Sequence, residues 1–338
     1  MLRDRGVSGP GPRPVSDRPA RRVSRLQDRY TASLLGGAIG DAMGRPYEFD
    51  DEPNAGREHV ELPVPALVTD ETQMALGVAR IAATARAGRG QRFADEMARW
   101  YTSGEHVGRA PGLTCIAVAR RIAEGEDWTR CAEADAKGCG GVMRSHPCAF
   151  LPYADDRVES AMIQSAITHG HPSASIAAKV WVEVVAAAAG GAEASSWLRV
   201  ARDAVFSPVP DIVGRWLGDL EEGREEMSEV LGRVARHAPG SGAAWGLGQD
   251  PCELVGLGWS AHEAVGTALL VAVRLASDPT ASVMRAARTA GDSDTLASMV
   301  GALLGAFHGT SAWPAPWCDA IEEPYRSDIY AMTLPSQF

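Results

Sequence analysis

Two short acidic segments contain the residue types that could do chemistry. Residues 69–72 read Thr-Asp-Glu-Thr and residues 292–295 read Asp-Ser-Asp-Thr, and each precedes an apolar run with helical spacing. Thr and Asp are common N-cap residues, and acids in a first turn complement the helix dipole, so capping alone could account for either segment. Capping uses one side chain, however, and each segment offers several oxygen ligands of the kind that Mg²⁺, Mn²⁺ or Ca²⁺ prefers.

The two segments together indicate more than either does alone. If they meet in the folded chain, the carboxylates of Asp70, Glu71, Asp292 and Asp294 face one point. Such a cluster repels itself unless cations lie within it, so a meeting of the segments indicates one divalent ion and more readily two. Their spacing along the chain does not by itself show that they meet.

Other motifs built from the same residue types are excluded. Residues 284–291 read as a helix and a turn, whereas the Asp nucleophile of the phosphatase motif follows a buried strand. Position 12 of an EF-hand loop counted from Asp292 would be Leu303 rather than glutamate. A zinc site is disfavoured because His169 and His171 have no cysteine pair near them.

Glycines and single polar residues mark further candidate positions. The glycine-rich segments 36–44 and 138–144 would let backbone N–H groups approach a diphosphate, but close helix packing and ordinary turns explain such segments equally well. His169 could contact a ligand or be a lone buried histidine. Glu48 lies between Tyr47 and Phe49, and could be a carboxylate with a raised pKa or a solvated acid.

The elements that must position these residues read as helices. Apolar residues recur at helical spacing in several places, most clearly in three sets: Met74, Val78 and Ile81; Ile176, Val180 and Val184; and Leu296, Met299, Val300, Leu303, Leu304 and Phe307. In the last helix, Gly301 and Gly305 would let a neighbouring helix approach closely. No alternating β-branched run and no internal repeat interrupts this pattern. The sequence therefore predicts an all-α fold in a single compact multi-helix domain.

Composition narrows the class of protein. The chain has 338 residues with 33 Lys+Arg against 43 Asp+Glu, 45% hydrophobic and 22% charged, as in an ordinary globular protein. Its net charge of −10 argues against bulk binding of nucleic acid. The sequence contains no run of 18 apolar residues, so it does not predict a membrane span. Six scattered cysteines without a Cys-x-x-Cys pair indicate reduced thiols in the cytoplasm.

The N-terminal end has a different composition. Residues 1–27 are rich in Arg and Pro and have no apolar core, so we predict a disordered leader followed by a helical domain over residues 28–338.

Taken in order, the segments resemble the ADP-ribosylglycohydrolases, the family of dinitrogenase-reductase-activating and ADP-ribosyl-acceptor hydrolases. The matching pieces are Gly40 to Gly44 with Pro46 and Glu48, Thr69 to Met74, Gly138 to Arg144, Thr168-His169, Gly258-Trp259 and Gly291 to Thr295. The resemblance covers about residues 28–320.

This resemblance implies a cleft with two divalent cations, Mg²⁺ or Mn²⁺. By position, Thr69, Asp70 and Glu71 would be metal ligands on one side of the cleft, and Asp292, Asp294 and Thr295 on the other. Glu48 would lie near the scissile bond, and Glu48 or Asp70 would be the general base. Gly138, Cys139, Gly140 and Gly141 would cradle the diphosphate or ribose, and His169 would lie near the ADP-ribose.

The implied reaction is hydrolysis of the glycosidic bond between ADP-ribose and an acceptor, most readily a modified protein, by a monomer. Arginine, serine, a nucleic-acid end and a small metabolite all stay open as the acceptor. The family usually has Asp where Glu71 stands and Thr where Ser293 stands. The alternative is therefore a non-catalytic ADP-ribose-binding protein that has kept the cleft.

Overall fold

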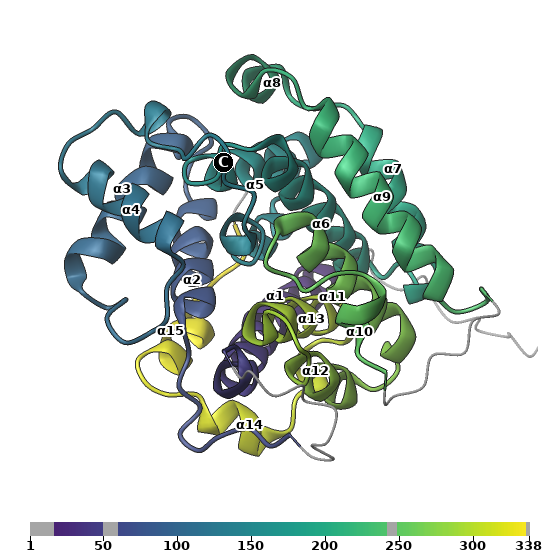
Figure 1. The fold of residues 1–338 in the computed structure, drawn as a ribbon. Coiled ribbons are helices and arrows are strands. Elements are labelled where there is room, and N and C mark those ends of the chain that lie inside the picture. The colour runs from purple at the N-terminus through teal and green to yellow at the C-terminus, as the bar shows by residue number, and fades with distance from the viewer. Residues whose placement is uncertain (1–16, 50–59, 242–248, 336–338) are drawn as a thin grey trace, which may run out of the picture.

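The computed structural model describes residues 17–49, 60–241 and 249–335. Within these ranges the chain is helical, and its β-pairing is limited to isolated bridges. The predicted all-α fold is confirmed (Figure 1). The helices are α1 (Asp17–Gly44), α2 (Asp70–Ala82), α3 (Arg89–Ser103), α4 (Leu113–Ala123), α5 (Ala154–Ala166), α6 (Pro172–Gly190), α7 (Trp197–Phe206), α8 (Asp211–Leu217), α9 (Glu221–His237), α10 (Pro251–Leu254), α11 (Ala261–Leu275), α12 (Pro279–Ala287), α13 (Ser293–His308), α14 (Ala315–Ala320) and α15 (Tyr325–Ala331).

Helices α1 and α13 pack antiparallel along a line of glycines. A Cβ atom on Gly36 would lie 2.2 Å from the carbonyl oxygen of Gly301, and one on Gly40 would lie 2.1 Å from that of Ala297. A Cβ on Gly305 would likewise meet the backbone of α1. Helix packing is therefore what Gly36, Gly40 and Gly44 do, one of the roles that the sequence left open. The antiparallel contact brings the C-terminal end of α1 to the N-terminal end of α13.

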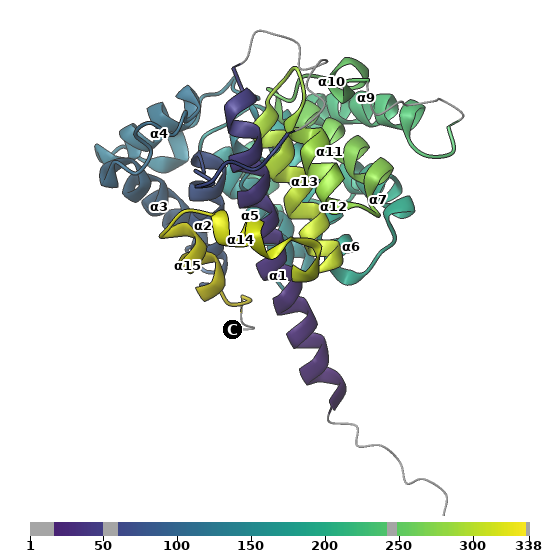
Figure 2. The same cartoon turned by 90° about the horizontal axis from the view of Figure 1, so that it is seen from below.

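Helix α1 begins earlier than the sequence predicts. We expected disorder up to residue 27, but residues 17–27 are already helical. Leu26 packs against the core, and Gln27 Nε2 donates a hydrogen bond of 3.0 Å to the carbonyl oxygen of Met332, so contacts with the C-terminal part of the chain stabilise this stretch. The first turns of α1 extend beyond the other helices in Figure 2. The rest of the predicted leader, residues 1–16, lies outside the described residues.

Helix α6 is the core helix of the second half of the chain. Helices α5, α7, α9, α11 and α13 pack around it, and Ile176, Val180 and Val184 are fully buried. Among the described helices it alone is long and apolar enough to cross a membrane, but 78% of that stretch is buried inside the protein. Its hydrophobicity is accounted for by these helical neighbours.

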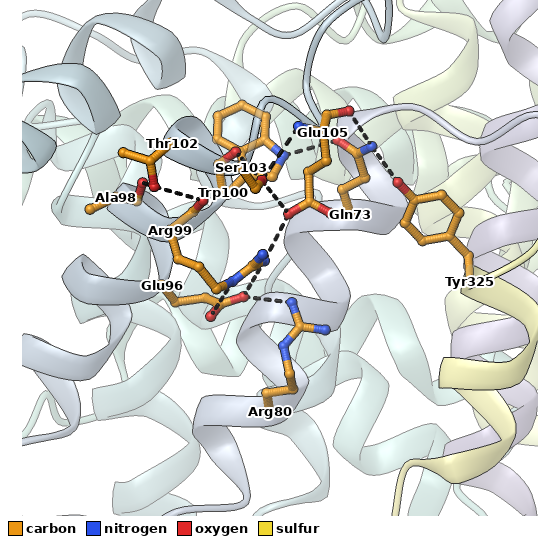
Figure 3. A network of polar contacts seen from close by, with 10 residues as sticks. All are labelled: Gln73, Arg80, Glu96, Ala98, Arg99, Trp100, Thr102, Ser103, Glu105 and Tyr325. Atoms are coloured by element: carbon orange, nitrogen blue, oxygen red, sulfur yellow. Dashed lines mark hydrogen bonds and ion pairs between the residues drawn. The ribbon is translucent and has the colours of Figure 1, made fainter.

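The first turn of α2 is held by a network around Gln73, drawn in Figure 3. Gln73 Nε2 donates to the carbonyl oxygen of Glu105 at 2.8 Å and to the hydroxyl of Tyr325 at 2.7 Å. Its Oε1 accepts a hydrogen bond of 2.9 Å from Trp100 Nε1. Separate parts of the chain, α3, the loop after it and α15, thus fix the turn that carries the acidic segment 69–72.

Candidate active site

Asp41 joins α1 to the first turn of α2. It is fully buried, and its carboxylate accepts hydrogen bonds from the backbone N–H groups of Thr69 (2.9 Å) and Thr72 (3.2 Å). Both threonine hydroxyls also donate to it, at 2.8 Å and 2.5 Å. The Thr69 side chain makes no capping hydrogen bond in α2, so a carboxylate from another helix satisfies N–H groups that the start of a helix leaves free.

Asp41 is not among the site residues expected from the sequence, although it lies inside the motif that begins at Gly40. The available signal was an acid between Ile39 and Met43 in an otherwise apolar helical run, since a buried charge requires partners. We had attributed that motif to its glycines.

The two acidic segments meet in the structure. Thr295 Oγ1 donates a hydrogen bond of 2.9 Å to Glu71 Oε1, although the residues are 224 positions apart. The other carboxylate oxygen of Glu71 contacts the hydroxyl oxygen of Thr69. Asp292 is at the same time the N-cap of α13, because its Oδ1 accepts from the backbone N–H of Thr295 at 3.4 Å. Capping and clustering thus occur together at α13.

Two groups of carboxylates could each hold a metal ion. Asp41, Glu71 and Asp294 place ligand oxygens within 4.8 Å of one another, and so do Glu48, Asp292 and Asp294. Asp294 belongs to both groups. The donors are oxygens throughout, which suits hard cations such as Mg²⁺ or Mn²⁺. Sequence analysis had placed Glu48 at the scissile bond only.

Burial and mutual repulsion alter the acidity of this cluster. Burial, together with the charge of Asp292, raises the pKa of Glu48 to about 8. Burial raises the pKa of Asp41 to about 6, against the hydrogen bonds from the two threonines. For Asp294, burial and then the charge of Glu71 raise the pKa well above its usual range, and Asp70 is shifted in the same direction. Without cations the site therefore retains protons that bound cations would displace.

These shifts predict how the metal-free protein responds to pH. Between pH 6.5 and 8 the folded state holds a proton on Glu48, whose ordinary pKa is 4.5, while the unfolded chain does not. The melting temperature measured in EDTA should therefore fall as pH rises through this window. His146 and His169, with pKa values lowered by burial to about 4 and about 3, oppose this trend below pH 6.5, and Lys179, whose pKa burial lowers to about 8, opposes it toward pH 8. The protons that the folded state also retains on Asp70 and Asp294 act in the same direction as that on Glu48 and keep the sign of the slope. Added Mg²⁺ should flatten or reverse the slope, and a melting temperature that rises with pH in EDTA would contradict the prediction.

A cavity of about 630 Å³ lies over the cluster. Its wall includes the predicted site residues Glu48, Asp70, Glu71, Gly138, Cys139, Gly140, His169, Asp292 and Thr295. Phe49 and Trp259, with ring centroids 6.2 Å apart, also line it. The acidic segments and the glycine-rich segment, which were separate candidates in the sequence, thus line the same cavity.

Three predicted site residues do not line this cavity. Thr69 and Asp294 lie behind the wall, with Asp294 in both carboxylate groups. Gly141 faces α5 instead, where a Cβ atom would lie 2.1 Å from Ser165 Oγ. The structure therefore brings Gly138, Cys139 and Gly140 to the cavity and leaves Gly141 as a packing position.

Cys139 and Gly140 connect the glycine-rich segment to its surroundings. Burial raises the pKa of the Cys139 thiol, which stays protonated and donates to Asp292 Oδ2 at 2.9 Å. A Cβ atom on Gly140 would lie 2.9 Å from both Cys115 Sγ and His169 Cε1, so no side chain fits there. The backbone of this segment therefore faces the cavity at close range.

His169 presents a neutral ring to the cavity. Burial, and then the charge of Arg144, lowers the pKa of His169 to about 3. Thr168 Oγ1 lies 2.8 Å from His169 Nδ1 and accepts a hydrogen bond of 2.8 Å from Arg144 Nη2. This chain of contacts fixes the ring orientation, so His169 can hydrogen-bond a ligand without changing its charge near neutral pH.

The sequence of this chain is matched by a family model. The model of the ADP-ribosylglycohydrolases matches residues 22–337, nearly the whole chain. The protein is thus an all-α enzyme of the glycosidic-bond hydrolase class. It belongs to the ADP-ribosylglycohydrolase family.

Individual relatives are distant. The ADP-ribosylarginine hydrolase Tri1 of Pseudomonas putida is 25% identical over 312 residues, covering 87% of this chain and 74% of that protein. The ADP-ribosyl-dinitrogen reductase glycohydrolase of Rhodospirillum rubrum is 30% identical over 163 residues, covering 44% and 53%. A solved structure named ADP-ribosylglycohydrolase-related protein complex has a TM-score of 0.66 at 23% identity and covers 93% of this chain and 100% of that one, which supports the fold.

Proposed function

We propose that the protein is a metal-dependent hydrolase that cleaves the bond between the anomeric carbon of ADP-ribose and an acceptor, and so reverses ADP-ribosylation. The observation that carries this proposal is the meeting of the two acidic helix ends beneath the cavity, with Asp294 common to two carboxylate groups. A site that only bound ADP-ribose would not need so many buried acids, whose burial is costly.

Two divalent cations, Mg²⁺ or Mn²⁺, would be held mainly by Asp41, Glu71, Asp292 and Asp294, while Glu48, which reaches the same space, would act at the scissile bond. Thr69, Asp70 and Thr295 offer further oxygens beside them. Such ions supply positive charge that orients bound hydroxyls and lowers the pKa of water.

The remaining residues bind the substrate and move protons. Backbone N–H groups of residues 138–140 and the neutral His169 would hold the diphosphate or the adjoining ribose. Glu48 or Asp70, both in the cavity wall, would take a proton from the attacking water while the bond to the acceptor breaks, and the same carboxyl would return that proton to the leaving acceptor. The surrounding negative charge favours the oxocarbenium-like transition state.

The acceptor we would test first is arginine on an ADP-ribosylated protein. Two relatives at 25% and 24% identity bear the name ADP-ribosylarginine hydrolase. The decisive experiment incubates the protein and Mg²⁺ or Mn²⁺ with substrates linked through arginine, serine, a nucleic-acid end or a small molecule, and measures free ADP-ribose. Release that needs the cation and stops in EDTA would support the proposal, and release from no substrate would refute it.

Replacing Glu48 with glutamine tests its role at the scissile bond. We expect hydrolysis to slow about 100-fold, as for loss of a general base, with Mn²⁺ affinity nearly unchanged by calorimetry. Asp292→Ala is the matched variant and should weaken Mn²⁺ binding as well. An equal loss of Mn²⁺ from both variants would show that Glu48 acts as a metal ligand.

Replacing Glu71 with aspartate separates the enzyme from the non-catalytic binder. Glu71 reaches both Thr69 and Thr295 with its two oxygens, and a side chain shorter by one methylene cannot reach both. We expect activity to fall about 10- to 100-fold, the size typical of a disturbed metal site. If the chain were instead a lapsed enzyme, aspartate would restore the usual family residue and free ADP-ribose would increase.

We also propose a monomer in the cytoplasm that binds neither membranes nor bulk nucleic acid. The net charge of −10 and the six free thiols support this proposal. Size-exclusion chromatography with light scattering would test the monomer.

A further inference from the structure

Side chains bind both backbone polar groups of Val68, the residue before the acidic segment of α2. The Val68 N–H donates to Glu322 Oε1 at 2.9 Å, and its carbonyl oxygen accepts from Arg109 Nη1 at 2.7 Å. Arg109 and Glu322 also pair with each other through both carboxylate oxygens. Val68 is fully buried and lies outside any helix, so this ion pair replaces the partners that secondary structure would supply.

The C-terminal part of the chain holds the same segment from a second side. Ala66 donates to the carbonyl oxygen of Ala320 at 2.8 Å, and its own carbonyl accepts from the backbone N–H of Glu322 at 3.2 Å. The Arg109 guanidinium lies 5.9 Å from the ring centroid of Tyr325, whose hydroxyl binds Gln73 (Figure 3). Contacts around Arg109 and Glu322 therefore reach both ends of segment 69–72.

Arg109 is also joined directly to the cavity wall. The next residue, Ala110, has φ of 53°, in the left-handed region that residues other than glycine rarely adopt. Residues 110–115 then line the cavity, whereas Arg109 and Glu322 do not. A strained residue persists only where its surroundings enforce its conformation, and the anchored Arg109 is its immediate neighbour.

We propose that Arg109 and Glu322 are positioning residues that couple the cavity wall at residues 110–114 to the metal-binding segment 69–72. The inference rests on the proposed function. Without Arg109 the carbonyl of Val68 and the carboxylate of Glu322 lose their shared partner, and the two segments can shift independently. Because coupling between two ligands is reciprocal, the pair makes metal binding and ADP-ribose binding strengthen each other.

The test measures Mn²⁺ affinity by calorimetry, with and without ADP-ribose, in the full chain and in Arg109→Met. In the unaltered chain we expect ADP-ribose to raise Mn²⁺ affinity about fivefold or more. In Arg109→Met we expect Mn²⁺ affinity to fall about tenfold and the effect of ADP-ribose to shrink below about twofold. Arg109→Lys keeps one donor for Val68 and should recover part of both quantities. Adding Glu322→Gln to Arg109→Met should cost little more, because the two residues act as one unit.

Arg80→Met is the matched control. It breaks the Arg80–Glu96 pair at the other end of α2, whose side chains are 35% and 15% exposed, against 22% and 14% for Arg109 and Glu322. Its Mn²⁺ affinity and the ADP-ribose effect should match those of the unaltered chain.

If Arg80→Met lowered the Mn²⁺ affinity and the ADP-ribose effect as much as Arg109→Met does, the proposal would be overturned. Such a result would indicate a general loosening of α2. Unchanged Mn²⁺ affinity and an unchanged ADP-ribose effect in Arg109→Met would also overturn it. If Arg109→Met did not fold, the same unchanged quantities in Arg109→Lys would overturn it. If the unaltered chain bound no Mn²⁺ at all, the proposed function would fail as well. If the unaltered chain showed metal-dependent hydrolysis but the Arg109 variants kept its Mn²⁺ affinity and ADP-ribose effect, only the coupling would be rejected.

Discussion

Replacing Asp294 with asparagine is expected to lower hydrolysis about 10³-fold, because the shared ligand of both carboxylate groups is lost and metal catalysis contributes several kcal/mol. The same change should raise the melting temperature of the metal-free protein. It replaces with a neutral amide a carboxyl group that burial and the charges of Glu71 and Asp292 force to take up a proton on folding, which costs free energy near neutral pH. Release of ADP-ribose measures the first effect, and thermal unfolding in EDTA measures the second. The increase in melting temperature that Mn²⁺ causes in the unaltered protein should disappear in the variant.

Asp203→Asn is the control for this prediction. Asp203 lies on α7, and its side chain is 69% exposed, so the control makes the same aspartate-to-asparagine change without touching the site. Hydrolysis and both melting temperatures should stay unchanged. A lower melting temperature for Asp294→Asn in EDTA would mean that the carboxylate stabilises the fold by itself, and the electrostatic account of the cluster would be wrong.

Replacing Gly40 with alanine is expected to disrupt the site from a distance. The new Cβ would lie 2.1 Å from the carbonyl oxygen of Ala297, so α1 and α13 must move apart. Overpacking of this kind costs about 1–3 kcal/mol of unfolding free energy. The same movement separates Asp41 on α1 from Asp294 on α13, so Mn²⁺ affinity and hydrolysis should fall about 100-fold, measured by calorimetry and release of ADP-ribose.

Gly37→Ala provides the comparison on the same helix. Its Cβ would lie 3.5 Å from the nearest atom, His146 Cε1, which is an ordinary contact. We expect nearly unchanged stability and activity, since alanine also favours the helix. If both variants behaved alike, the close approach of the helices at Gly40 would not be what positions the carboxylates.

Much of the architecture could be predicted because helices depend on local patterns. The spacing of Met74 and Val78 predicted α2, and the apolar set from Leu296 to Phe307 predicted α13, as the structure confirms. Local patterns misled at the N-terminus, where composition predicted disorder up to residue 27 and contacts of Leu26 and Gln27 with distant residues support a helix.

The types and positions of most candidate site residues were also readable from the sequence. Asp70, Glu71, Asp292 and Asp294 stand at helix starts, where capping preferences and metal-ligand chemistry select the same residue types. Since either role satisfies the local pattern, sequence alone could not decide between them. At α13 the tertiary structure leaves room for both roles, because Asp292 caps the helix while its carboxylate faces the cluster.

The tertiary structure decided what depends on residues that are distant in the chain. The meeting of Glu71 with Thr295, the inclusion of Asp41, and the packing role of Gly36 and Gly40 all follow from how α1 lies against α13. Helical periodicity determines which face of a helix is apolar, but not which neighbour covers it or at what distance. The sequence therefore determined the helices and their candidate ligands, and close packing of backbone against backbone brought those ligands into one site.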